Sequence, residues 1–248
     1  MIELKTPEEV EKIRKSGKIL RFALDIVREK IKPGVTTLDL SKIAEDFILS
    51  QGAIPAFKGY RGFPEALCIS VNDELIHGIP GNRKIIDGDV IKVDGGVILE
   101  GWYSDAAFTV IAGEPHSESD SKLVSATERS LEEGLYMAKA GNRLGDIGFA
   151  IQNFVEREGF SVIRDYSGHG VGRNLHEDPS VPNFGRKGQG FALKEGMVIA
   201  IEPMVSQGSY KLFVDLNGWT VKTVDGSRTA HFEHTVAITE NGPDILTL

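Results

Sequence analysis

Two stretches of the 248-residue chain repeat each other, and this repeat constrains the fold more than any other feature of the sequence. Residues 34–52 align with residues 141–159 at an offset of 107, with two glycines, an aspartate and a phenylalanine in common. Residues 88–94 align with residues 196–202 at an offset of 108, and each segment ends in a carboxylate. Binary pattern alone can produce such similarity, but a matched acid after a matched apolar strand is less easily accidental. We therefore expect two related halves around a pseudo-twofold axis, which would bring the two acids together.

The predicted elements follow in the order helix, strand, helix, strand. Thr6, Pro7 and Glu9 provide an N-cap, a proline in the first turn and a capping-box acid, so a helix should begin there and run to about Ile31. Further helices are expected at residues 36–50, 120–138 and 146–158, which have helical patterns. Segments rich in β-branched and aromatic residues predict strands at 66–71, 75–79, 89–98, 102–111, 197–205, 210–214, 220–224 and 230–239.

The composition is typical of a globular protein, with 41% hydrophobic and 26% charged residues. No stretch rich in Ser, Pro or Gly marks a flexible linker. We therefore expect residues 1–248 to form a single domain of the α/β (α+β) class, with the internal repeat at about 32–112 and 139–240.

Charge, cysteine content and the lack of long apolar runs argue against a nucleic-acid-binding, a disulfide-bonded, a secreted or a membrane protein. A net charge of −8 argues against broad binding to nucleic acid, and the basic residues between positions 12 and 18 have the spacing of a solvated helix face. The single cysteine, Cys68, excludes an intramolecular disulfide. The first 17 residues lack the apolar run of a secretory signal, and apolar runs such as 197–201 are too short to cross a bilayer. We expect a cytoplasmic protein that binds neither DNA nor a membrane.

Two aspartates stand on the arms of a predicted hairpin. A two-residue turn at Leu99-Glu100 would place Asp94 directly opposite Asp105, and a turn at Glu100-Gly101 would make them diagonal neighbours on the same face. A three-residue loop would put them on opposite faces. Two adjacent carboxylates repel each other, so they should share a proton or a cation, unless one of them faces solvent.

Three further residues favour the cation. His169 lies between glycines that permit close backbone approach, while Glu202 and Glu233 stand in runs that otherwise resemble buried strands. Four carboxylates carry a charge of −4 that two divalent cations would neutralise, and no comparable set of Lys or Arg lies near these motifs in the sequence. Oxygen ligands with one histidine suit Co, Mn, Fe or Zn in a hydrolytic pair.

Seven ordered motifs, spread over nearly the whole chain, resemble those of type I methionine aminopeptidases in their short prokaryotic form. They are residues 75–80, 93–94, 104–105, 168–170, 175–179, 201–204 and 232–235. The resemblance implies the pita-bread fold, in which two related α/β halves form an antiparallel sheet with outer helices around a pseudo-twofold axis. It agrees with the repeat found in the sequence.

The resemblance also implies a set of metal ligands and a mechanism. A water or hydroxide between two metal ions would attack the first peptide carbonyl, polarised by a metal, and Glu202 would shuttle the proton. His176 would stabilise the tetrahedral intermediate, and His77 would contact the substrate backbone. The implied ligands are Asp94, Asp105, His169, Glu202 and Glu233, with Asp105 and Glu233 bridging both ions.

The implied activity is removal of the N-terminal methionine from nascent polypeptides, with a small second residue favoured. The side chain of methionine would occupy a pocket built from Tyr60, Phe63, Cys68, His77 and Trp219, although the aromatic residues could equally be ordinary packing residues. Phe63 stands where some relatives carry tyrosine, and Leu175 where some carry phenylalanine. A transient contact with the ribosome and a monomeric state are further expectations.

The same residues permit other interpretations of the function. A proline-specific aminopeptidase of the same fold usually has an extra N-terminal domain, for which 248 residues leave no space, and a non-catalytic peptide-binding relative would not need all five ligands. A structural metal site is usually rich in cysteine.

The glycines at 168–172 lack the third glycine of a dinucleotide motif, because Arg173 occupies its place. Of the histidines beside Glu233, only His231 should reach the site, because His234 points to the opposite face.

Overall fold

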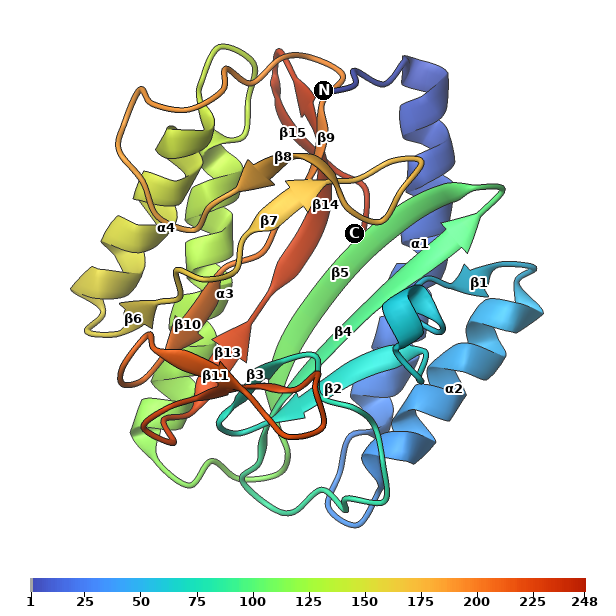
Figure 1. The fold of residues 1–248 in the computed structure, drawn as a ribbon, viewed down its shortest axis with the longest axis vertical. Coiled ribbons are helices and arrows are strands. Elements are labelled where there is room, and N and C mark those ends of the chain that lie inside the picture. The colour runs from blue at the N-terminus through green and yellow to red at the C-terminus, as the bar shows by residue number, and fades with distance from the viewer. Residues whose placement is uncertain (1) are drawn as a thin grey trace.

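A nine-stranded, largely antiparallel sheet forms the centre of the computed structural model, which describes residues 2–248 (Figure 1). The main path of the sheet runs β1-β4-β5-β14-β9-β7-β8, with β2 added to β4 and β15 added to β14. Four α-helices lie on one side of this sheet. An added side chain at Gly95 would meet Leu20 of α1, and one at Gly134 of α3 would meet Ile201 of β9. The helices therefore cover one face and leave the other for the site.

The first two helices begin where the sequence predicts. Helix α1 (Pro7–Lys30) has Thr6 as its N-cap, and the Thr6 side chain accepts a hydrogen bond from the Glu9 backbone N–H while the Glu9 carboxylate accepts one from the Thr6 N–H. Helix α2 (Thr37–Ser50) begins with the same capping box, formed by Thr36 and Asp39. Met1, which begins the segment compared with a signal sequence, lies outside the described residues.

The other two helices begin two residues earlier than predicted. Ser117 caps α3 (Glu118–Met137), and the Asp146 side chain accepts a hydrogen bond from the Arg143 N–H at the start of α4 (Leu144–Arg157). The prediction placed the two starts at Asp120 and Asp146 and so left out Glu118-Ser119 and Leu144-Gly145. Helices α2 and α4 each contain 14 residues and start 107 positions apart, which is the offset of the repeat.

The central hairpin joins β4 (Val90–Leu99) to β5 (Trp102–Ile111) through a two-residue turn at Glu100-Gly101. Both turn residues have positive φ, 51° and 78°, as a type I′ turn requires. Asp94 pairs with Ala107 and Asp105 pairs with Gly96, so the two aspartates are diagonal neighbours on one face. The second of the turns considered from the sequence is therefore the one that forms, and the direct pairing and the three-residue loop are wrong.

Two predicted strands are each broken in the structure. The segment 197–205 forms β9 (Val198–Ile201) and β10 (Met204–Ser206), because Pro203 has no N–H to continue the ladder. The segment 230–239 forms β13 (Thr229–His231) and β14 (Glu233–Thr239), separated by Phe232. Strands β9 and β14 belong to the large sheet, whereas β10 and β13 belong to a three-stranded sheet with β6. Glu202 and Glu233 thus lie where the chain passes from one sheet to another.

The remaining elements are short. Residues 75–79 were predicted as a strand, but only the first part is one, because His77 has a φ of 58°. No helix within residues 2–248 is long and apolar enough to span a membrane. The sequence did not predict β1, β6, β7, β8 or β15, most of which have only two to four residues. The bounds are β1 (Ile54–Pro55), η1 (Tyr60–Gly62), β2 (Leu67–Val71), β3 (Glu74–Ile76), β6 (Ser161–Val162), β7 (Gly168–Gly170), β8 (Glu177–Val181), β11 (Leu212–Val214), β12 (Val221–Thr223) and β15 (Gly242–Ile245).

Candidate metal centre

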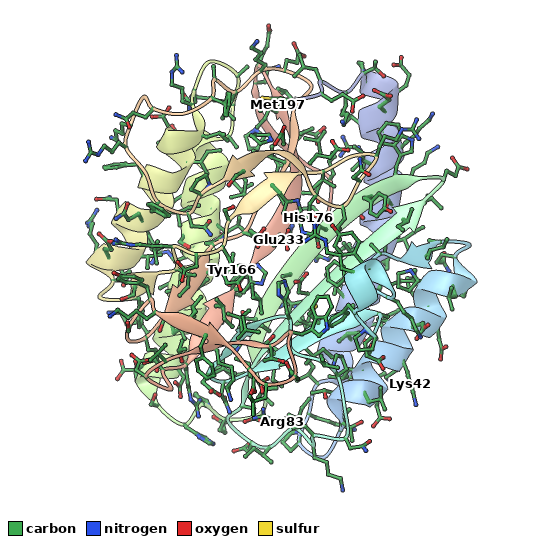
Figure 2. All side chains as sticks on the ribbon, in the orientation of Figure 1. Lys42, Arg83, Tyr166, His176, Met197 and Glu233 are labelled. Carbon is green, nitrogen blue, oxygen red and sulfur yellow. The ribbon has the colours of Figure 1, made fainter. Side chains whose placement is uncertain are left out.

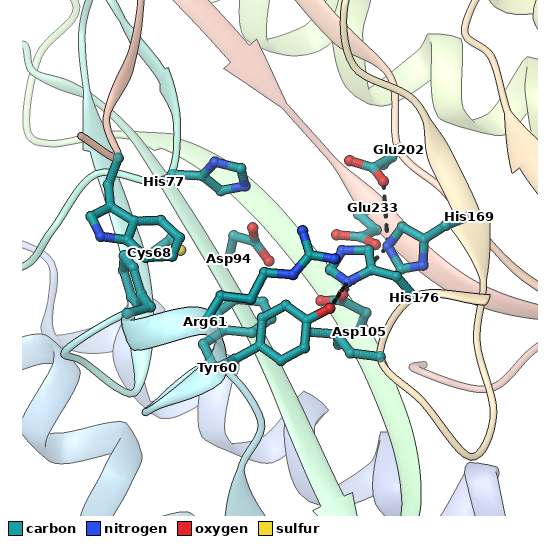
Figure 3. A pocket seen from close by; sticks show the side chains of 14 residues that line it. Tyr60, Arg61, Cys68, His77, Asp94, Asp105, His169, His176, Glu202 and Glu233 are labelled. Atoms are coloured by element: carbon teal, nitrogen blue, oxygen red, sulfur yellow. Dashed lines mark hydrogen bonds and ion pairs between the residues drawn. The ribbon is translucent and has the colours of Figure 1, made fainter. Parts of the chain in front are cut away.

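Neighbouring strands of the large sheet present four carboxylates and one imidazole on the same side (Figure 3). Ala107 of β5 pairs with Asp94 on one flank and with Glu233 on the other, so these two acids lie in one row across three strands. Asp105 lies two residues from Ala107 and shares its face. Glu202 follows the end of β9, and His169 is the central residue of β7.

These acids lack the partners that buried carboxylates normally have. Asp94 and Glu202 are 9% exposed, and Asp105 and Glu233 are 4% and 2% exposed. One carboxylate oxygen each of Asp94, Asp105 and Glu233 is buried with no hydrogen-bond partner. Each buried carboxylate oxygen without a partner costs on the order of 1–3 kcal/mol or more, unless a cation binds it. The donor set therefore fits metal ions.

His169 is oriented as a metal ligand. Its Nδ1 lies 3.0 Å from the Gly170 carbonyl oxygen, and because a carbonyl only accepts, Nδ1 carries the hydrogen. The Nε2 lone pair then faces the acids, 3.6 Å from a Glu202 oxygen and 3.7 Å from an Asp105 oxygen. Asp105, His169 and Glu233 each offer a ligand atom within 4.8 Å of the others, and so do Glu202, His231 and Glu233.

The electrostatics of the metal-free site are those of an acid cluster that cannot ionise completely. Burial raises the pKa of Glu202 to about 8 and, with the nearby Glu202 charge, that of Asp94 to about 7. Burial and then the neighbouring carboxylates raise the pKa values of Asp105 and Glu233 well above their usual range. Burial lowers the pKa of His169 to about 4, so its ring is neutral at pH 7 and can donate a lone pair.

His231 lies behind the acids, as expected of the histidine that shares their face. Its Nε2 is 3.5 Å from a Glu202 oxygen and 3.9 Å from a Glu233 oxygen, and burial lowers its pKa to about 4. Neither ring nitrogen has a hydrogen-bond partner. His234 points to the other side of the sheet, where its Nδ1 lies 2.9 Å from the Thr247 hydroxyl.

The backbones of two acids are fixed by side chains that the sequence analysis did not single out. The Asn183 amide donates to the Glu202 carbonyl at 2.9 Å, and Asn183 is 1% exposed. The Thr235 hydroxyl donates to the Asp105 carbonyl at 2.7 Å and accepts from the Asp105 N–H at 2.9 Å. No sequence motif marks Asn183, because its contact depends on how a loop folds back onto the strand.

An apolar pocket adjoins the acids. Phe63 and Trp219 meet edge to face with ring centroids 5.2 Å apart, and Cys68 pairs with Asp94 across β2 and β4. Burial and the Asp94 charge raise the pKa of the Cys68 thiol, so Cys68 is an inert wall residue and no nucleophile. His77 stands at the edge of the pocket, 6.0 Å from the Tyr166 ring, and burial lowers its pKa to about 4.

The open side of the cavity is formed by Tyr60, Arg61 and His176. The His176 ring lies tilted against the His169 ring with centroids 4.3 Å apart, and its Nδ1 lies 3.0 Å from the Tyr60 hydroxyl, which leaves Nε2 for a ligand. Figure 2 shows His176 and Glu233 in the middle of the molecule, whereas Lys42 and Arg83 lie at its edge.

One cavity of about 180 Å³ contains all the site residues that the sequence analysis named. Phe57, Arg61 and Leu175 also line it. Leu175 was noted only as a departure from the family pattern, and Phe57 and Arg61 were missed. The signal in the sequence that could have identified Arg61 is its position between two predicted pocket residues, Tyr60 and Phe63. The residues brought together are Tyr60, Phe63, Cys68, His77, Asp94, Asp105, His169, His176, Glu202, Trp219 and Glu233.

Comparison with known proteins adds an independent observation. Residues 11–240 match the model of metallopeptidase family M24. A methionine aminopeptidase from Clostridium perfringens is 53% identical over 100% of this chain and 99% of that protein, and one from Escherichia coli is 43% identical over 100% and 94%. The crystal structure of the Rickettsia prowazekii methionine aminopeptidase superposes with a TM-score of 0.98 at 41% identity, covering all of both chains. A prolidase from Pyrococcus furiosus gives 0.81 at 26% identity over 99% of this chain and 65% of that one.

Proposed function

The chain belongs to metallopeptidase family M24 and, within it, to the methionine aminopeptidases, and from this premise we propose how its residues remove an N-terminal methionine. The proposed reaction is hydrolysis of the first peptide bond of newly made polypeptides, with a small second residue favoured. The observation that carries it is the buried cluster of unpaired carboxylates in one cavity with an apolar wall of Phe63, Cys68 and Trp219.

Two divalent ions, Co, Mn, Fe or Zn, would neutralise the four carboxylates and supply Lewis-acid activation of the scissile carbonyl and the attacking water. The unpaired oxygens of Asp94, Asp105 and Glu233 support this ligand set, as does the lone pair of His169 Nε2. The residues that would hold the ions are Asp94, Asp105, His169, Glu202 and Glu233.

Glu202 would accept the proton of the attacking water and deliver it to the leaving amine. A buried carboxylate beside the proposed water site is within reach of both the attacking water and the leaving amine, which supports this role. Asn183 holds its backbone, and His231 at 3.5 Å limits where its carboxylate can move. Both contacts support a fixed position for the proton-transfer group.

The histidines would bind the reacting peptide group. His176 Nε2 faces the cavity on the acid side and would donate to the developing oxyanion. His77, at the edge of the pocket, would contact the substrate backbone. The methionine side chain would lie between Phe63, Cys68 and Trp219, a soft apolar surface suited to a thioether.

The alternative of a proline-specific peptidase has weaker support. The prolidase match spans 65% of that longer protein at 26% identity, whereas the methionine aminopeptidases match over their whole length. A non-catalytic relative would have no need for the complete set of unpaired acids. We further propose a single catalytic domain of two related halves, a monomer in the cytoplasm, and a transient contact with the ribosome, because nascent chains are the proposed substrate.

The test is release of free methionine from the peptide Met-Ala-Ser by metal-stripped protein, with and without added Mn, Co, Fe or Zn, and with the N-acetylated peptide as control. Metal-dependent release from the free amine alone is expected, and Glu202→Gln should fold but lose turnover. No release with any metal would move the function to a binding relative or to another peptidase specificity.

A further inference from the structure

Arg61 brings a free positive charge to a cavity whose other ionisable groups are acids, histidines, a tyrosine and a thiol. None of the four site carboxylates forms an ion pair with its guanidinium, which instead lies 5.4 Å from the centroid of the Tyr60 ring. Arg61 is exposed, so the charge also faces solvent. An unpaired cation at the mouth of a binding cavity is available to a ligand.

The backbone holds Arg61 in a fixed position. Its φ is 49°, a left-handed conformation that is uncommon for a residue with a side chain, and Gly59 and Gly62 on either side have φ values of 84° and 90°. The Phe63 N–H donates to the Tyr60 carbonyl at 3.0 Å, and the Gly59 N–H donates to the Phe63 carbonyl at 2.8 Å. The loop therefore presents Arg61 rigidly, with only the side chain free to adapt.

Arg61 lies on the open side of the cavity, where a peptide chain beyond the scissile bond would leave. Phe63 and Cys68 on the apolar wall are buried, and the carboxylates line the same cavity. Figure 3 shows the Arg61 side chain extending across the front of the cavity toward His176. A peptide chain that leaves the site must pass this open side.

We propose that Arg61 selects substrates with an acidic side chain at the third residue, an inference that rests on the proposed methionine aminopeptidase activity. An aspartate or glutamate there would pair with the guanidinium, whereas a lysine would be repelled. Ion pairs at exposed sites are weak, so the preference should be about two- to fivefold in kcat/KM and should fall as salt rises. This ion pair discriminates between substrates by the charge of their third residue, which lies beyond the two residues that the active centre itself contacts.

The experiment compares kcat/KM for three peptides, Met-Ala-Asp-Ser, Met-Ala-Asn-Ser and Met-Ala-Lys-Ser, all amidated so that no terminal carboxylate competes. The metal-loaded wild type should prefer Asp over Asn, and Asn over Lys. Arg61→Gln should bring the three values together, and Arg61→Glu should reverse the order. Arg157→Gln is the matched control, because it removes the same charge from an exposed position on α4 and should keep the wild-type order.

The outcomes separate this inference from the proposed function. If the wild type fails to release methionine even from the Asn peptide, the proposed activity is wrong, and the inference is wrong with it. If release occurs at equal rates for Asp and Asn, or if Arg61→Gln keeps the wild-type preference, only the role of Arg61 is overturned. Melting temperatures of the variants within a few degrees of the wild type show that the ratios report binding and not unfolding.

Discussion

At the scale of single residues, the contacts of a side chain predict which property its substitution should change. His176 contacts Tyr60 and His169. It belongs to neither of the two groups of potential metal ligands, in which the ligand atoms lie within 4.8 Å of one another. A residue so placed can bind the reacting group without holding a metal. Its role is therefore separable from that of the proposed ligands.

Replacing His176 by alanine should lower kcat by about 100- to 1,000-fold, the usual cost of removing one oxyanion donor. The metal content per protein, measured by mass spectrometry of the dialysed variant, should match that of the wild type. Loss of metal from His176→Ala would contradict the assignment, because it would mean that the ring supports the metal site itself.

Lys92 is a buried cation outside the catalytic cluster. It is 1% exposed, and its ammonium donates to the Asn72 carbonyl at 2.8 Å and the Val90 carbonyl at 3.3 Å. Burial lowers its pKa from 10.5 to about 7. Between these two pH values the unfolded chain holds a proton that the folded protein has lost, so this residue makes stability rise with pH from 7 to 10.5.

Lys92→Met should remove that rise. Urea unfolding of wild type and variant, both in chelator, would be followed from pH 6 to pH 10.5. The wild type should gain free energy of unfolding relative to Lys92→Met as pH increases through this window, with no change below pH 6. A difference that stays constant across the window would mean that Lys92 keeps its proton when buried.

At the scale of elements, the site depends on close backbone contacts between strands. A Cβ added at Gly78, next to His77, would lie 2.3 Å from the Ile69 carbonyl oxygen of β2. Backbone cannot move aside as a flexible side chain can, so β2 or the segment that carries His77 must shift. Strand β2 carries Cys68, which makes both walls of the apolar pocket sensitive to this contact.

Gly78→Ala should destabilise the protein by about 1–3 kcal/mol, the range for overpacking, and should raise KM for methionyl peptides. Gly81→Ala is the matched control, because no atom lies within 4 Å of its added Cβ and its φ is not positive. Urea unfolding and steady-state kinetics of both variants provide the measurements. Equal stability of the two variants would show that the segment around Gly78 relaxes freely.

At the scale of the whole molecule, the acid cluster couples metal binding to stability. The carboxyl pKa values are raised in the metal-free fold, to about 7 for Asp94 and about 8 for Glu202. Groups with raised pKa contribute stability that is complete below their unfolded pKa, near 4, and is lost as pH rises through the folded values. The metal-free protein should therefore become less stable from pH 4 to pH 8.

Metal ions should reverse this trend, because they bind the ionised carboxylates and bind them more tightly as protons leave. The difference in melting temperature between metal-loaded and chelator-treated protein should grow from pH 5 to pH 8. Differential scanning calorimetry with Mn or Co at fixed free concentration would measure it. A difference independent of pH would show that the acids are already ionised without metal.

Much of the fold and of the candidate site follows from local sequence signals. The capping boxes at Thr6 and Thr36 start two helices, and apolar alternation marks β4 and β5, because both signals act over a few residues. The acids were recognisable as a group because a carboxylate in an apolar strand needs a partner wherever the strand lies. These are properties that neighbouring residues decide.

Tertiary structure alone decided the rest. The break at Phe232 depends on two sheets meeting beside the acids, and the turn at Glu100-Gly101 was one of three that the sequence permitted. Asn183 reaches Glu202 because a loop folds back, and Arg61 comes to line the same cavity as the four site acids without forming an ion pair with any of them. Contacts between residues far apart in the chain form only when the whole fold closes, so no local pattern records them.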